Sequence, residues 1–154
     1  MSSAYIYDKA EYHYETVELH NLPRSHASDH TLPILRWFID NDLMSEFFLS
    51  TCSDEIAEYR RGKMSLQDLY AWWDECLAGE MVSDEGNAFG QEYFDFSKGR
   101  YISDYVELLQ GSFPSEFHVK YDDANYAVLK NRIDERYREW KNRNRPWWRL
   151  WRSK

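Results

Sequence analysis

The chain is poor in cysteine, the residue that builds many zinc and redox sites in small domains. It has two cysteines, Cys52 and Cys76, and neither has another cysteine or a histidine beside it at metal-ligand spacing. This arrangement does not match a zinc-binding or redox motif. We expect both thiols to be free and buried, as in a protein of the reducing cytoplasm.

Long apolar runs are also missing. There is no run of about 18 consecutive apolar residues, the length that would indicate a transmembrane helix. The first residues lack the cationic stretch and following apolar stretch of a secretory signal peptide. These absences favour a cytoplasmic location.

Aromatic residues, by contrast, are abundant. They make up 18% of the 154 residues, within a hydrophobic content of 43%. A chain of this length fits one domain and can bury about two thirds of its unfolded surface. Because aromatic side chains bury large areas and so offset the entropy lost on ordering, we expect a folded domain rather than a disordered chain.

The charge is unevenly distributed. The net charge is -8, but six cations and no acids lie between Lys141 and the C-terminus, so residues 1–140 have 13 cations, 27 acids and a net charge of -14. A body this acidic repels nucleic acid and anionic membranes, and it attracts basic partners from a distance. We therefore expect a protein partner and no nucleic acid.

Capping residues and apolar spacing predict helices along most of the chain. The expected helices span residues 31–41, 53–61, 65–79, 83–96, 101–111 and 123–144. Residues 1–30 have little helical periodicity and are expected to be irregular or partly extended, and "FHVKY" (117–121) is expected to be a short strand. The prediction is a mainly α fold: a single-domain bundle of five to six helices over residues 1–141, followed by a basic tail over residues 142–154.

The N-terminal histidines suggest a metal-dependent enzyme as one alternative. His20, His26 and His30, with Asp29 beside them, hold a metal only if their loop makes the side chains converge. The chain has neither the Glu-x-x-His pair of a di-iron bundle nor the His-Glu-x-x-His motif of a zinc peptidase. Loop and capping hydrogen bonds explain these histidines better, so we expect no bound metal and no cofactor.

The helix expected over residues 83–96 is acidic. Asp84, Glu85, Glu92 and Asp95 lie on it, and Glu85 and Glu92 share a face because they are seven residues apart. Paired carboxylates act as acid and base, or hold a cation, only when further groups face them. A solvated helix face is the simpler interpretation.

Two glycines in the same helix raise the question of a nucleotide site. Gly86 and Gly90 lack the following lysine and the preceding strand of a phosphate-binding loop, so we expect them to allow a neighbouring helix to pack closely. No nucleophile signature surrounds the serines or cysteines. The sequence therefore favours a protein that is not an enzyme.

The basic tail contains Trp147, Trp148 and Trp151. In a helix beginning at Pro146, two of these tryptophans and Leu150 would share one side, as in a membrane-surface segment. The segment is too short to be helical alone in water. We expect it to fold back onto the acidic body; docking on a partner, membrane association and nucleic-acid binding are the alternatives, in that order.

Several stretches resemble a known kind of protein: residues 7–14 ("YDKAEYHY"), 30–48, 83–95, 101–109 and 118–141. Together they cover most of residues 5–141. They resemble a family of small acidic bacterial cytoplasmic domains without a characterised activity, similar to the immunity proteins encoded beside polymorphic or secreted toxins. The resemblance carries no catalytic residues and implies a binding role.

The expected function is therefore an immunity protein that binds a cognate toxin domain and blocks its active site or its access to substrate. Acidic side chains would steer a basic toxin surface, and exposed aromatic side chains would anchor it. The expected partner-binding residues are Asp84, Glu85, Glu92, Tyr93 and Asp95, with a second patch at Asp122 and Asp123. An adaptor or membrane-peripheral protein that uses the tail is a further alternative.

The membrane-peripheral alternative for the tail can be tested with liposomes. We predict that the full chain and a version ending at Asn142 remain in the supernatant to the same extent after co-sedimentation, because the tail offers little apolar area. Recovery of the full chain alone in the pellet would show membrane association instead.

Overall fold

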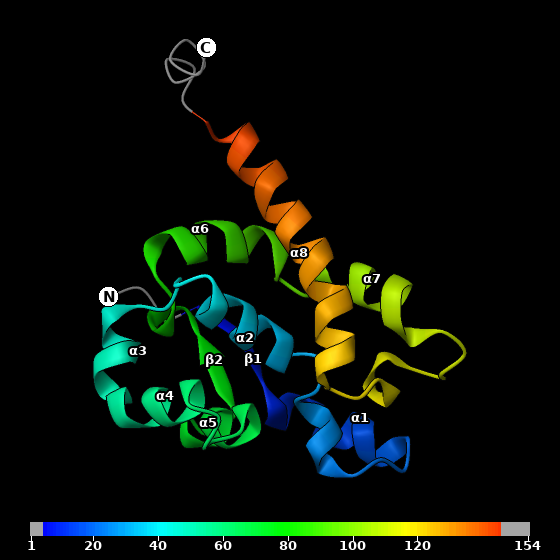
Figure 1. Ribbon diagram of the computed structural model, residues 1–154. Helices are drawn as coiled ribbons and strands as arrows, with labels where there is room; N and C mark the ends of the chain where they lie inside the picture. The colour runs from blue at the N-terminus through cyan, green and yellow to red at the C-terminus, as the bar shows by residue number, and fades with distance from the viewer. Residues whose placement is uncertain (1–4, 146–154) are drawn as a thin grey trace.

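The computed structural model describes residues 5–145, and the fold is mainly helical, as predicted (Figure 1). The α-helices are α1 (Tyr14–Leu19), α2 (Leu32–Asp40), α3 (Glu46–Thr51), α4 (Ser53–Arg60), α5 (Leu66–Trp72), α6 (Asp84–Tyr93), α7 (Tyr101–Tyr105) and α8 (Asp123–Arg143). Short 3-10 helices span Ala10–His13, Arg24–Ala27, Gly79–Met81 and Glu116–His118, and a π-helical turn spans Val106–Gln110. Strands β1 (Ile6–Lys9) and β2 (Cys76–Ala78) form a small sheet.

The tail predicted to fold back lies mostly beyond these residues. Trp147, Trp148 and Trp151 are outside the described range, so their predicted contacts are outside it as well. Within residues 5–145, no helix has both the length and the apolar character needed to span a bilayer.

The helix predicted over residues 65–79 ends early. The Ser65 side chain caps it by accepting a hydrogen bond from the Asp68 N–H, as expected, but α5 stops at Trp72. Asp74 and Glu75 then have φ angles of 56° and 50°, in the left-handed region that ends helices. The chain continues as β2, because antiparallel pairing with β1 supplies the backbone hydrogen-bond partners there.

Three other segments differ from the prediction. Residues 14–19 form helix α1, within a region expected to be irregular or partly extended. Residues 46–51 form α3, which the sequence did not indicate, and the Ser45 side chain caps it by accepting from the Phe48 N–H. The strand expected over residues 117–121 is wrong: residues 116–118 form a 3-10 turn. The described sheet consists of β1 and β2, and neither pairs with this segment.

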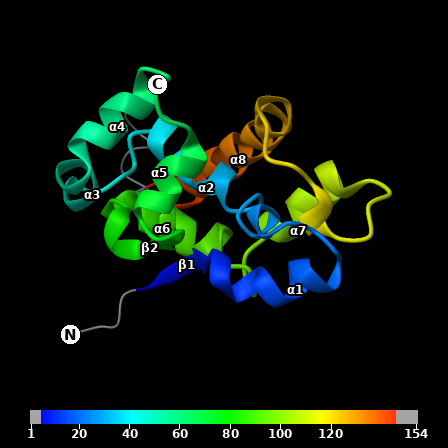
Figure 2. The ribbon, with the colours of Figure 1, turned by 90° about the horizontal axis from the view of Figure 1, so that it is seen from below.

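Helix α2 forms the centre of the core. Helices α3 to α5 lie on one side of it and α1 and α7 on the other (Figures 1 and 2). The Trp37 ring of α2 is fully buried, 5.4 Å from the Phe89 ring on α6 and 5.1 Å from the Tyr137 ring on α8. Its indole N–H donates to Asp134 at 2.9 Å. α6 and α8 therefore close over one face of α2.

A smaller hydrophobic cluster lies beside α1. Its buried members are Ala10, Val17, Ala27 and Phe117. The His30 ring lies 5.2 Å from the Phe117 ring and 5.3 Å from that of Phe96, which packs against the main core. His30 thus lies where the two clusters meet.

The cysteines are free, as predicted, but only one is fully enclosed. Cys52 is buried, and its thiol donates to the Phe48 carbonyl oxygen at 3.2 Å. Cys76 on β2 is half-buried. Burial raises the pKa of both thiols above the ordinary value, which disfavours their nucleophilic form.

The predicted close packing at the α6 glycines is confirmed. A Cβ atom at Gly86 would lie 3.0 Å from the Leu43 carbonyl oxygen. One at Gly90 would lie 2.5 Å from the Tyr7 hydroxyl oxygen and 2.9 Å from Cζ of Phe38. Glycine is required here because β1 and α2 approach the α6 backbone too closely for a side chain.

We predict that Gly90→Ala lowers the free energy of unfolding by about 1–3 kcal/mol, the usual cost of overpacking a core. Urea denaturation measures this change. Gly79→Ala is the matched control, because the nearest atoms to its added Cβ lie at 3.4 Å, an ordinary contact distance. Equal stability of the Gly90 variant and the native chain would contradict the packing described.

Candidate functional site

One long segment of the chain carries negative charge without compensation. Residues 64–97 contain no lysine or arginine, and they run from α5 through β2 to the loop after α6. Their acids are Asp68, Asp74, Glu75, Glu80, Asp84, Glu85, Glu92 and Asp95. This segment therefore contributes strongly to the acidic surface.

An aromatic patch, defined here as Phe47, Trp72 and Trp73, lies where α3 meets the end of α5. The Trp73 ring stacks on the buried Phe48 ring at 5.1 Å. It also lies 5.8 Å from Phe47 and 5.2 Å from Trp72, so it links these two side chains. Phe47 is 47% exposed and Trp72 is 42% exposed. The patch thus presents two large rings to solvent on a buried aromatic base.

A pocket of about 440 Å³ adjoins the aromatic patch. Trp73 forms part of its wall, and acids outnumber cations along it. The pocket is lined by Lys9, Glu11, Tyr14, Trp73, Asp74, Cys76, Ala78, Glu80 and Met81. Indole faces and carboxylates together attract cationic side chains, through the ring quadrupole and through charge.

The predicted acids of α6 remain on the surface, and two of them accept hydrogen bonds from α8. Asp84, Glu85 and Glu92 are exposed. Glu85 accepts from the Tyr137 hydroxyl at 2.9 Å, and Glu92 pairs with Arg143 at 2.7 Å. One cation of the basic C-terminal stretch therefore lies on an acid predicted to bind a partner.

The other two predicted residues of this region are engaged within the fold. Tyr93 is 5% exposed and its hydroxyl donates to Asp104, so the expectation of an exposed tyrosine anchor is wrong here. Asp95 accepts from Ser97, Lys98 and the Tyr5 hydroxyl. These hydrogen bonds, with that of the Ser97 side chain the strongest influence, lower the pKa of Asp95 to about 2.

The second predicted patch lies at the other end of α8. Asp122 caps this helix by accepting from the Asn125 N–H, and Asp123 pairs with Arg36 at 2.8 Å. Since α8 has 21 residues, its two ends are about 30 Å apart. The structure does not bring Asp122 and Asp123 together with the acids of α6.

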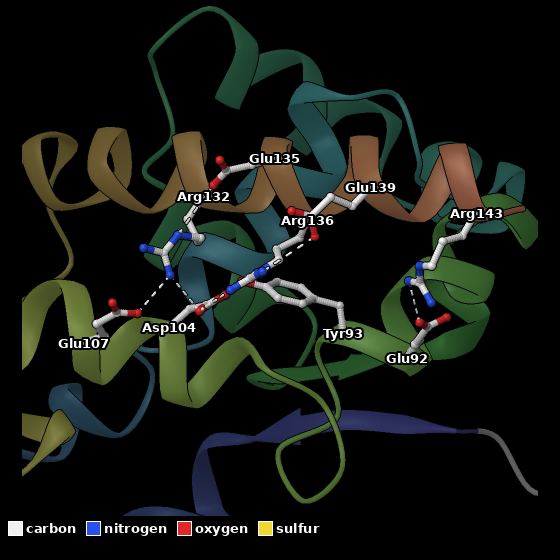
Figure 3. A network of polar contacts seen from close by, with 9 residues as sticks. All are labelled: Glu92, Tyr93, Asp104, Glu107, Arg132, Glu135, Arg136, Glu139 and Arg143. Atoms are coloured by element: carbon white, nitrogen blue, oxygen red, sulfur yellow. Dashed lines mark hydrogen bonds and ion pairs between the residues drawn. The ribbon is translucent and has the colours of Figure 1, made fainter.

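A buried carboxylate on α7 connects three helices (Figure 3). Asp104 is 3% exposed and accepts from the Tyr93 hydroxyl at 2.8 Å. Arg136 of α8 binds both of its oxygens at 2.9 Å, and Arg132 binds one at 2.8 Å. Burial alone would raise the pKa of Asp104, but the hydrogen bonds from Arg136 and Tyr93 hold it below its ordinary value.

The histidines predicted as an alternative metal site are not brought together. His20 lies against the His118 ring at 5.2 Å. The Nδ1 atom of His26 lies 2.9 Å from the Phe117 carbonyl oxygen and 3.3 Å from Asp29. Loop hydrogen bonding thus accounts for His26, as the sequence indicated.

The third histidine, His30, lies against Asp8 and His13, two residues that the sequence analysis did not identify as a possible site. His30 lies 3.3 Å from Asp8, and His13 lies 2.7 Å from the other oxygen of that carboxylate. The Thr31 hydroxyl also donates to Asp8, at 2.5 Å. Burial would raise the pKa of Asp8, but the hydrogen bonds from both histidines and Thr31 lower it to about 2. No local spacing signals this group, because β1 and the segment before α2 meet only in the folded chain.

Comparison with known proteins gave one match. Residues 6–119, most of the chain, match the model of a family described as a domain of unknown function (DUF7832). The searches of curated proteins and of solved structures gave no match. The matched range contains Asp8, the aromatic patch, α6 and α7, whereas α8 follows it.

We predict that Asp104→Asn lowers the free energy of unfolding by about 3 kcal/mol, because it leaves two arginines without their buried anion. Asp123→Asn is the control: Asp123 pairs with Arg36 while 93% exposed, and loss of a surface ion pair costs about 1 kcal/mol or less.

The stabilisation from Asp104 is fully present above its ordinary pKa of 3.8 and is lost as the pH falls through its lower folded pKa. Urea titrations between about pH 2 and 6 test this, and a variant and native chain that remain equally stable at pH 6 would contradict it.

Proposed function

We propose a protein-binding role of the immunity type for this chain, which belongs to the DUF7832 family. The chain would bind a basic toxin domain and block its active site or its access to substrate. The family's description assigns no activity, so the proposal rests on the surface of the molecule. The observation that carries it is the aromatic patch beside the acidic pocket.

The aromatic patch has the properties of an interface anchor. Tryptophan and other large aromatic side chains are enriched among the residues that dominate binding energy, since they bury much area with few rotatable bonds. Phe47 and Trp72 are exposed, yet Trp73 and the buried Phe48 support them from below. A rigid base reduces the side-chain entropy lost on binding.

Charge supports a basic partner. Residues 1–140 have a net charge of -14, and residues 64–97 carry eight acids and no lysine or arginine. This field accelerates encounter with a cationic surface and disfavours acidic competitors. At the patch itself, arginine or lysine side chains of the partner would stack on Trp72 and pair with Asp74 and Glu80.

The acids that the sequence analysis expected to contact the partner have a smaller role in this proposal. Asp84, Glu85 and Glu92 contribute to long-range attraction, while the aromatic patch supplies the contact energy. Asp122 and Asp123 lie beside Arg36 at the far end of α8 and take no part in the anchor.

The proposal is tested with the protein encoded immediately upstream, whose C-terminal domain is expected to be toxic. Co-expression of the full chain should restore growth, and the two proteins should co-purify. We predict that the double variant Phe47→Ala and Trp72→Ala weakens binding at least roughly 30-fold, the equivalent of about 2 kcal/mol, and abolishes protection. Calorimetry and a growth assay measure the two effects.

Phe113→Ala is the matched control, because Phe113 is a surface aromatic residue with 50% exposure. It should leave both binding and growth unchanged. An upstream protein that is harmless or does not bind would overturn the proposed function. A double variant that binds as tightly as the native chain would remove the aromatic patch as its site.

A further inference from the structure

The strongest unassigned feature is the buried group of Asp8, His13 and His30. Their carboxylate and imidazole donor atoms all lie within 4.8 Å of one another. A search of the described residues for three or more histidine, cysteine or acidic side chains with donor atoms this close together gives this group. It is separate from the aromatic patch and has no part in the proposed function.

Burial makes the charge of this group significant. Asp8 and His30 are each 2% exposed, and the His13 side chain is 18% exposed. A buried anion is costly unless a cation compensates it, and neutral histidines contribute only hydrogen bonds. A metal cation bound by the three side chains would compensate the charge of the buried carboxylate.

The surroundings hold the three side chains in place. The Thr31 hydroxyl donates to Asp8, as the outer hydrogen bonds of metal-ligating carboxylates commonly do. The Tyr101 hydroxyl donates to the His30 carbonyl oxygen at 2.7 Å and fixes the backbone there. The His13 and His30 rings meet edge to face at 4.6 Å. The donors are therefore positioned by packing and by hydrogen bonds from outside the group.

Two buried polar atoms close to this region indicate that its hydrogen bonding is incomplete. Nδ1 of His30 and the Tyr70 hydroxyl have no hydrogen-bond partner within residues 5–145. The pKa of Tyr70 is raised by burial and then by the charge of Asp8. Unpaired buried polar groups are rare in folded proteins, and an ordered water or ion is one of the established reasons for them. The His30 atom that faces Asp8, and that would bind the metal, is Nε2, so Nδ1 would lie outside the coordination sphere.

We propose that Asp8, His13 and His30 form a binding site for a divalent transition-metal ion of the zinc class. Two imidazoles and one carboxylate suit this class, which takes nitrogen and oxygen ligands at about 2.0–2.2 Å in four-coordinate sites. A magnesium ion is disfavoured because it prefers an all-oxygen environment. The metal would join β1, the 3-10 turn before α1 and the segment before α2.

Metal binding to the purified, tag-free full chain tests the proposal. After treatment with a chelator, the chain is titrated with zinc chloride and, separately, with magnesium chloride by calorimetry. We expect one zinc ion per chain and no magnesium. His13→Gln should weaken zinc binding by more than roughly 100-fold, and Thr31→Val, which removes only the outer hydrogen bond, by roughly 10- to 100-fold.

His20→Gln is the control, since this exposed histidine lies in the same part of the chain and outside the group. It should bind zinc as the native chain does. Circular dichroism verifies that each variant is folded. A native chain that binds no zinc at one equivalent would overturn the proposal whatever the variants do, and so would a folded His13 variant with native affinity.

Discussion

The fold depends on one buried carboxylate. Asp104 binds Arg132 and Arg136 of α8 and the hydroxyl of Tyr93 at the end of α6. Helix α8 is largely polar, and only Tyr126, Leu129 and Ile133 are buried along its 21 residues. Tyr137 and Trp140 of α8 are partly buried and also pack against the core. Apolar contacts alone leave a helix free to rotate or slide, and the two-point contact of Arg136 with Asp104 fixes its rotation.

The position of α8 matters because it completes the core of the family domain. The matched range ends at residue 119, before α8 begins. Yet the Trp37 ring at the centre of that domain packs against Tyr137 and donates to Asp134, both on α8. The same helix places Arg143 on Glu92 and Tyr137 on Glu85, so it covers part of the acidic surface. It leaves the aromatic patch of α3 and α5 unobstructed.

The sequence predicted those elements that local chemistry determines. Ser65 and Ser83 both cap helices, and α8 begins at Asp123, the residue from which the long C-terminal helix was predicted. The prediction from sequence failed where contact with a distant segment determines the local secondary structure. Leu77 fits a helical repeat and is nevertheless in a strand, because β1 pairs with it from nearly 70 positions away.

The candidate site residues show the same contrast between features set by local sequence and features set by distant contacts. The acids of α6 were correctly expected at the surface, since charged side chains of a helix face water by default. Tyr93 is buried because Asp104 on another helix satisfies its hydroxyl. The exposure of Trp72 and the convergence of Asp8 with His13 and His30 depend on tertiary packing, which helical spacing alone does not encode. The sequence therefore indicated an acidic surface, and the structure was needed to locate the exposed aromatic patch beside it.

The central claim is that Asp104 makes α8 a cooperative part of this fold. Native-state hydrogen exchange tests it most directly, by comparing the opening free energies of backbone amides between Tyr126 and Ile133 with those in α2. The account predicts that both sets exchange through the same global opening, with equal free energies and equal dependence on urea. Exchange of the α8 amides through a separate opening of much lower free energy would contradict it.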